Sequence, residues 1–114
     1  MANERMMQIS KGLITAKNHS EYHLARAHEF AEEHGFDAPV FFQHPLWEED
    51  IKDIVDAIRE AGFDQVYIAS ASSGMLEIIY LFQEAGGKMG DMHKMTWYNE
   101  WKSEYTLHGI KITF

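Results

Sequence analysis

A chain of 114 residues, 46% of them hydrophobic, is long enough to build one core and too short for two domains. Its lack of cysteine excludes disulfides, thiolate metal sites and cysteine nucleophiles, and is typical of a reducing compartment. The net charge of −8 opposes contact with nucleic acid or an anionic membrane. We therefore expect a single acidic α/β domain, residues 1–114, that is cytoplasmic and binds neither.

The N-terminal third contains one clear helix signal. Apolar residues between positions 6 and 14 are interpreted as an added N-terminal strand. A helix is then predicted from about Ser20 to His34, with Asn18 or Ser20 as its cap and Gly35 as its stop. Asparagine and serine accept hydrogen bonds from the free amides of a first turn, and glycine adopts the left-handed conformation that ends a helix.

A second helix is predicted from Pro45 to Gly62. Proline suits a first turn, three acids follow it near the positive end of the helix dipole, and glycine ends the pattern. The apolar positions recur at the three–four spacing of one helical face: Trp47, Ile51, Ile54, Val55 and Ile58.

Two short apolar runs between helices, Pro39–Phe42 and Gln65–Ala69, are predicted strands because of their β-branched and aromatic content. Each follows the sequence Glu-X-Gly-Phe-Asp, in which an acidic helix ends at a glycine. Two such helix–strand units predict parallel neighbours joined by a right-handed crossover.

A third helix is predicted between Gly74 and Gly86, and it is apolar nearly all round. The face expected to pack on the sheet contains Met75, Leu76, Ile78, Ile79, Phe82 and Ala85. A helix this apolar needs cover on more than one side. That second cover is either another element of the chain or another molecule, a second copy or a partner. In the latter case we expect the interface to include Tyr80, Leu81, Trp97 and Trp101.

Residues 104–114 alternate apolar and polar side chains on either side of His108–Gly109, which predicts a tight hairpin turn at that glycine. Met95–Trp101 is interpreted as another strand or an aromatic loop. The predicted fold is α/β, with α+β as the alternative. It has a mixed sheet, about three helices, two parallel helix–strand units and a C-terminal antiparallel hairpin.

The acidic charge is uneven, because twelve of the eighteen acids lie between residues 21 and 64 beside only three bases. Four of them recur at i, i+4, i+7 and i+11 along one face of the second helix: Glu49, Asp53, Asp56 and Glu60. Such a ladder of carboxylates suits docking to a basic partner. It is equally typical of the solvated face of an amphipathic helix.

The turn between the second strand and the third helix carries small hydroxyl residues, Ser70, Ser72 and Ser73, before Gly74. Free amides and the helix dipole meet at such a junction, which favours a small anionic ligand. The turn matches neither a P-loop nor a dinucleotide fingerprint, and serine also caps helices without any ligand.

Seven histidines raise the question of a metal site. His19 and His23 have the spacing that brings two side chains together on a helix, but His28 turns to a different face. No third ligand has a recognisable spacing, so we expect no metal and no cofactor. Histidines in this segment still make its charge sensitive to pH between about 5 and 8.

These observations favour a non-enzymatic binding, inhibitory or regulatory protein that presents its acidic helix to a basic protein partner. In size and charge the chain is similar to small acidic binding proteins such as immunity proteins and phage-encoded nuclease inhibitors, although no motif carries that likeness. One alternative is a small-ligand domain or minor enzyme that uses the Ser70–Gly74 turn with a histidine as base. The other is a homo-oligomeric subunit, for example a homodimer, assembled through residues 75–85.

Overall fold

The computed structural model describes residues 2–44, 46–69 and 74–114. Within these ranges the chain forms four α-helices, one short 3₁₀-helix and four strands. In chain order they are α1 (Ala2–Ser10), α2 (His19–His34), β1 (Phe41–Phe42), η1 (Glu48–Asp50), α3 (Ile51–Ala61), β2 (Gln65–Ile68), α4 (Met75–Glu84), β3 (Lys88–Tyr98) and β4 (Glu104–Thr113).

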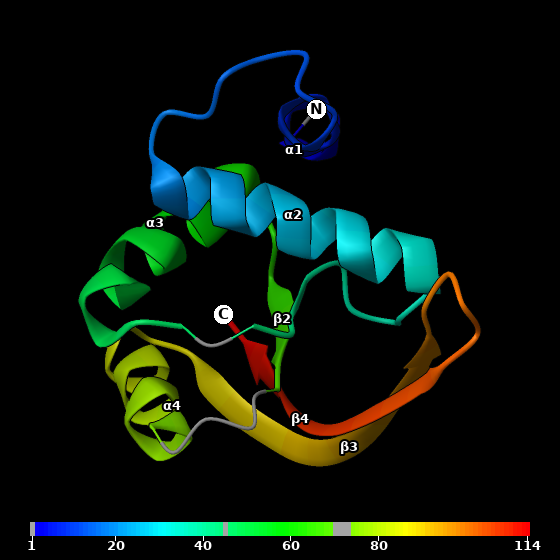
Figure 1. Ribbon diagram of the computed structural model, residues 1–114. Helices are drawn as coiled ribbons and strands as arrows, with labels where there is room; N and C mark the ends of the chain where they lie inside the picture. The colour runs from blue at the N-terminus through cyan, green and yellow to red at the C-terminus, as the bar shows by residue number, and fades with distance from the viewer. Residues whose placement is uncertain (1, 45, 70–73) are drawn as a thin grey trace.

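The strands form one mixed sheet in the order β1-β2-β4-β3. β1 and β2 are parallel, with Phe41 opposite Tyr67, whereas β4 is antiparallel to both β2 and β3. The predicted α/β class and the two parallel helix–strand units are therefore confirmed, with one helix more than expected. An antiparallel C-terminal hairpin is also present, but it is formed by β3 and β4 and not within residues 104–114. Figure 1 shows the β3–β4 hairpin curving away from β2 toward the end of α2.

The helices α2 and α3 end in the same way, as the repeated Glu-X-Gly-Phe-Asp sequence predicts. Gly35 and Gly62 both adopt the left-handed conformation, with φ of 67° and 81°. The next residue closes each end, since Phe36 N–H donates to the Ala31 carbonyl and Phe63 N–H donates to the Ile58 carbonyl. These paired bonds satisfy carbonyls that the last turn leaves free, and they aim each following segment at the sheet.

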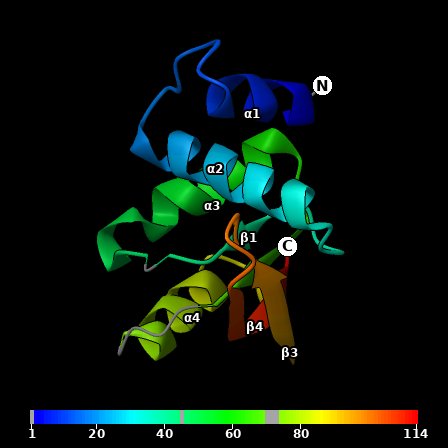
Figure 2. The same cartoon turned by 45° about the vertical axis from the view of Figure 1, so that its right-hand side comes forward.

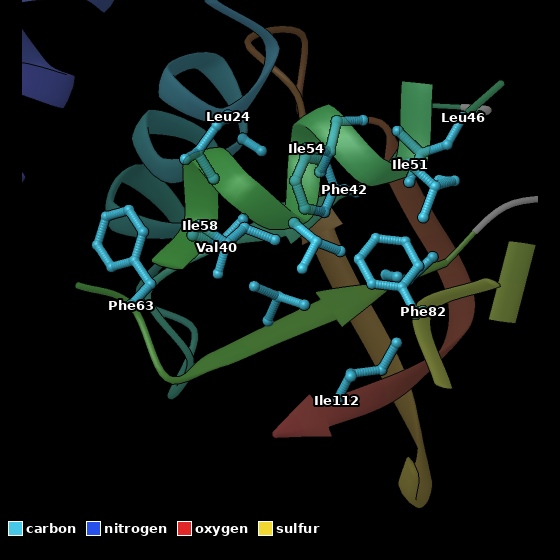
Figure 3. Packing of buried hydrophobic residues seen from close by; sticks show 14 of the residues in the cluster. Leu24, Val40, Phe42, Leu46, Ile51, Ile54, Ile58, Phe63, Phe82 and Ile112 are labelled. Carbon is cyan, nitrogen blue, oxygen red and sulfur yellow. The ribbon is translucent and has the colours of Figure 1, made fainter. Parts of the chain in front are cut away.

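The main core lies between the helices and one face of the sheet. Figure 3 shows side chains from α2, α3, α4 and the strands meeting there, among them Leu24, Ile54, Phe42, Phe82 and Ile112. Phe82 is fully buried. Truncating such a side chain to alanine typically costs about 3–5 kcal/mol. Ile78 and Phe82 are the buried residues of α4, so this helix is anchored in the core by two side chains on one side.

A second, smaller cluster covers part of the other sheet face and is largely aromatic. Phe41 and Trp97 lie at its centre with ring centroids 5.6 Å apart, and Phe30 of α2 contacts Trp97 edge-on at 5.3 Å. Trp97 also stacks on Tyr105 across the hairpin. The tip of the β3–β4 hairpin is thus packed against the end of α2.

The expected N-terminal strand is wrong, because residues 2–10 form helix α1. Met6 and Ile9 are three apart and therefore share one helical face, and both are 2% exposed in the main core. Figure 2 shows α1 lying across α2 on the side away from the sheet. The helical period was present in the sequence, but the short apolar run resembled a strand.

The expected hairpin turn at His108–Gly109 is also wrong, because both residues lie inside β4 opposite His93 and Lys94. The chain instead turns at residues 99–103, where the Asn99 side chain accepts hydrogen bonds from the backbone N–H groups of Trp101 and Ser103. A Cβ on Gly109 would lie only 3.2 Å from the Ile68 carbonyl oxygen. That glycine therefore permits a close approach of β2 and β4 and is not a turn residue.

Two residues expected on buried helical faces are exposed. Trp47 is 65% exposed, because it precedes η1 in an extended conformation and the helical spacing does not yet apply to it. Leu76 is 77% exposed, whereas Leu81, expected toward solvent, packs against the main core. Because apolar residues occur all round α4, the sequence did not define which side of the helix is buried. In the structure Ile78 and Phe82 point into the main core, and α4 packs beside α3 and η1.

Candidate functional site

The four predicted carboxylates lie on the solvent side of η1 and α3. Glu49, Asp53, Asp56 and Glu60 are all exposed, as is the neighbouring Glu48. Glu60 forms an ion pair with Lys17. No described residue forms an ion pair with the other four, which we call the acidic surface: Glu48, Glu49, Asp53 and Asp56.

Three other acids, Glu21, Glu29 and Asp37, have basic partners, whereas no described residue forms an ion pair with Glu32 or Glu33 of α2. Glu21 accepts two hydrogen bonds from Arg5, with the shorter at 2.9 Å, and this contact holds the pKa of the Glu21 carboxyl below its usual range despite burial. Glu29 lies 3.6 Å from Arg26, and Asp37 lies 3.4 Å from Lys111. The acidic charge is therefore partly neutralised in α2 and after it, and is left unpaired on the acidic surface.

An exposed tryptophan lies at the edge of the acidic surface. Trp47 directly precedes Glu48 and is 65% exposed. The helix α4 packs beside η1 and presents Leu76 and Tyr80, which are one turn apart and both exposed. A hydrogen bond with Glu84 raises the pKa of the Tyr80 hydroxyl. Charge and exposed apolar area thus occur on adjoining elements.

The predicted interface residues do not form one surface. Tyr80 is exposed on α4, whereas Leu81 is partly buried against the main core. Trp97 belongs to the aromatic cluster and is only 8% exposed. Trp101 is exposed in the turn between β3 and β4. Of these four residues, Tyr80 and Trp101 are therefore free to contact another molecule.

The strand-to-helix junction predicted as an anion site is present, since β2 ends at Ile68 and α4 begins at Met75. Ser70, Ser72 and Ser73 lie outside the described residues. Gly74 is the N-cap of α4 and supplies no side-chain hydrogen bond to it. Ligand binding at this turn stays a prediction.

A cleft of about 410 Å³ lies between α2 and the segment that leaves β1. Tyr22, Phe30, Phe41 and Phe42 contribute its aromatic lining. Its basic side chains are His19, His23 and Arg26 from α2 and His44 from the segment after β1. We call it the histidine cleft. A volume of this size falls within the range of small-molecule sites in proteins, roughly 300–1,000 Å³.

His23 occupies the centre of these basic groups. Its ring lies 6.1 Å from that of His19 and contacts Phe42 edge-on at 5.5 Å. Partial burial lowers the pKa of the His23 imidazole, and His19 and His44 lower it further, while Asp50 opposes them. His28 has a different role, because it is buried and its Nδ1 lies 2.7 Å from the Pro39 carbonyl oxygen. Across the described ranges, no three His, Asp or Glu side chains are placed to hold a metal ion.

Sequence reasoning missed the histidine cleft because its walls come from separate elements. The i, i+4 spacing of His19 and His23 was visible, but nothing in the sequence indicated that His44 would lie near them. The available signal was the parallel strand β1, because its carboxyl end brings residues 43 and 44 to the edge of the sheet beside α2.

None of the helices in the described ranges has the length and apolarity that a bilayer crossing requires. Comparison with known proteins found no match among curated proteins and none among solved structures. A family model described as Domain of unknown function (DUF7698) matches residues 23–114, and the chain belongs to this family. The match begins within α2 and takes in all four strands, α3 and α4, but not α1.

Proposed function

We propose that this member of the DUF7698 family is a non-enzymatic binding protein that presents the acidic surface to a basic protein partner. The observation that supports the proposal is the unpaired state of these carboxylates. Glu48, Glu49, Asp53 and Asp56 follow one another along η1 and α3 and are exposed without an ion pair to any described residue, whereas Glu21, Glu29 and Asp37 each have one. A basic partner can pair with these carboxylates without breaking an ion pair between described residues.

Trp47 offers a partner an exposed apolar side chain beside the carboxylates of the acidic surface. Exposed carboxylates mainly speed association and set orientation, and each contributes little affinity in water. Tryptophan is the residue type that most often dominates binding energy at protein interfaces. Its 65% exposure beside Glu48 therefore gives the acidic surface an anchor.

The test is affinity capture from cell extract followed by binding kinetics on the captured pair. Reversing Asp53 and Asp56 to Lys is expected to slow association roughly tenfold or more and to weaken its dependence on salt. The matched control reverses Glu100 and Glu104 to Lys, which makes the same charge change at the hairpin, across the molecule from α3 in Figure 1.

Equal slowing in both variants would mean that only net charge matters, and the proposed site would be abandoned. Capture of a partner whose binding ignores both variants and salt would refute the acidic surface as well. An acidic captured partner would count against the proposal in the same way.

A second candidate function is self-association through α4, supported by the exposure of Leu76 (77%) and Tyr80 (57%) on one side of that helix. If two copies meet there, sedimentation velocity will show a concentration-dependent dimer that Leu76→Asp abolishes. A wild type that stays monomeric at high concentration would exclude it.

A further inference from the structure

The histidine cleft combines an aromatic floor with a polar rim. Phe41 and Phe42 are fully buried at its base, and Tyr22 at its rim is 46% exposed. His23 already contacts the Phe42 ring edge-on. The aromatic side chains of the lining that are not fully buried are Tyr22 and Phe30. A flat aromatic molecule entering the cleft would contact these rings and the imidazoles, which are favourable partners for another ring.

The charge balance of the cleft differs from that of the whole protein. Its acids are Glu29 and Glu33, and Glu29 is already engaged by Arg26 and by the Ser10 hydroxyl. The His19 and His23 rings lie 6.1 Å apart, and both His19 and His44 lower the pKa of the His23 imidazole. An anion placed among them would receive hydrogen bonds and relieve their mutual repulsion.

We propose that the histidine cleft binds a small planar aromatic molecule carrying one acidic group. The ring lies against Tyr22 and Phe30, and the anionic group lies among His19, His23 and His44. This site is separate from the acidic surface, so binding there is independent of the proposed basic partner. Binding strengthens as His23 gains a proton, and the charged groups that modulate it are Asp50 at the start of α3 together with Arg26, Glu29 and Glu33 of α2.

The test uses 2-naphthoate as the probe and follows backbone amide signals by NMR at about pH 7.5 and about pH 5.5, where its carboxylate stays ionised. We expect the perturbed signals to come from residues 19–33 and 41–44. The dissociation constant is expected to fall roughly tenfold at the lower pH, the effect of one charge-assisted hydrogen bond.

Two histidine variants separate the cleft from general effects of pH. His23→Gln and His44→Gln are each expected to remove most of the gain at low pH. His108→Gln, an exposed histidine on β4, is the control and is expected to keep the whole gain. If His23→Gln proves poorly folded by circular dichroism, His44→Gln decides the matter, because His44 is exposed and its loss leaves the core intact.

Three results would overturn the proposal. The first is absence of binding at both pH values. The second is equal binding of neutral 2-naphthamide, which would remove the need for an anion. The third is perturbation centred on Trp47, Leu76 or Tyr80, which would place the probe on the exposed apolar side chains near α4.

Discussion

The helices α3 and α4 pack into the same core, but only α3 divides cleanly into a buried and an exposed side. In α3 the apolar residues are buried and all the charged ones are exposed: Lys52, Asp53, Asp56, Arg59 and Glu60. In α4 only Ile78 and Phe82 are buried, while Leu76 and Tyr80 lie in solvent. The rotation of a helix is thus indicated best by its charged residues. Where charged residues are few, as in α4, the rotation is set by packing into the main core beside α3 and η1.

The largest expected effect is a difference in unfolding free energy between substitutions at two apolar positions of α4. Ile78→Asp places an unpaired charge in the main core and is expected to unfold the protein, with a loss above about 4 kcal/mol. Leu76→Asp makes a comparable change two residues earlier, where the side chain is exposed, and is expected to stay within about 0.5 kcal/mol of the wild type. Urea unfolding followed by circular dichroism measures both. A Leu76→Asp protein as unstable as Ile78→Asp would show that α4 is covered on both sides.

Much of the fold could be predicted because local chemistry and tertiary packing agree. Asn18 accepts a hydrogen bond from the Glu21 N–H, and Gly35 and Gly62 end their helices at the expected positions. The predictions were wrong where one local sequence pattern is compatible with two different structures. Gly109 suited a turn as well as a close strand approach, and the apolar residues of α1 suited a strand as well as a helix.

A smaller difference in stability is expected between substitutions at the C-terminal ends of α3 and α4. Gly62→Ala forces a side chain into the left-handed conformation that ends α3 and is expected to cost about 1–2 kcal/mol. The helix α4 ends at Ala85 with φ of −83°, so Ala85→Gly meets no such strain and is expected to cost about 0.5 kcal/mol. Thermal unfolding of the two variants gives the ranking. The opposite order would mean that the two ends share a requirement that their backbone angles do not show.

The smallest expected effect is a change of stability with pH near the start of α3, which has no counterpart at α4. His23 faces Asp50 at the start of α3, and its pKa is lowered in the folded protein, whereas α4 contains no histidine. The neutral form is therefore favoured by folding, and this contribution to stability is present above about pH 6.5 and is lost as the pH falls below it. We expect unfolding midpoints to fall modestly between about pH 7 and about pH 5.5, and His23→Gln to flatten the curve. An unchanged slope in that variant would assign the effect to another group.

The candidate sites were less accessible to sequence reasoning than the fold. Glu49, Asp53 and Asp56 of the acidic surface were predicted because they recur at helical spacing, whereas Glu48 was not among the predicted residues. The histidine cleft was not found, since it depends on how close β1 brings His44 to α2. Which acids remain unpaired was equally hidden, because Lys17 reaches Glu60 from a distant part of the chain.

The central position of β4 has a consequence for the order of folding. β4 pairs with β3 across a short turn, but with β2 only after the chain from residue 68 to residue 104 has been enclosed. Closing a short loop loses less conformational entropy than closing a long one, so the hairpin forms first and β2 is added to its free edge later. The close approach of Gly109 to Ile68 belongs to this later step. A bulkier residue at position 109 is therefore expected to accelerate unfolding and to leave the folding rate nearly unchanged, provided that the contact forms after the transition state. A slower folding rate would mean that the contact forms before it.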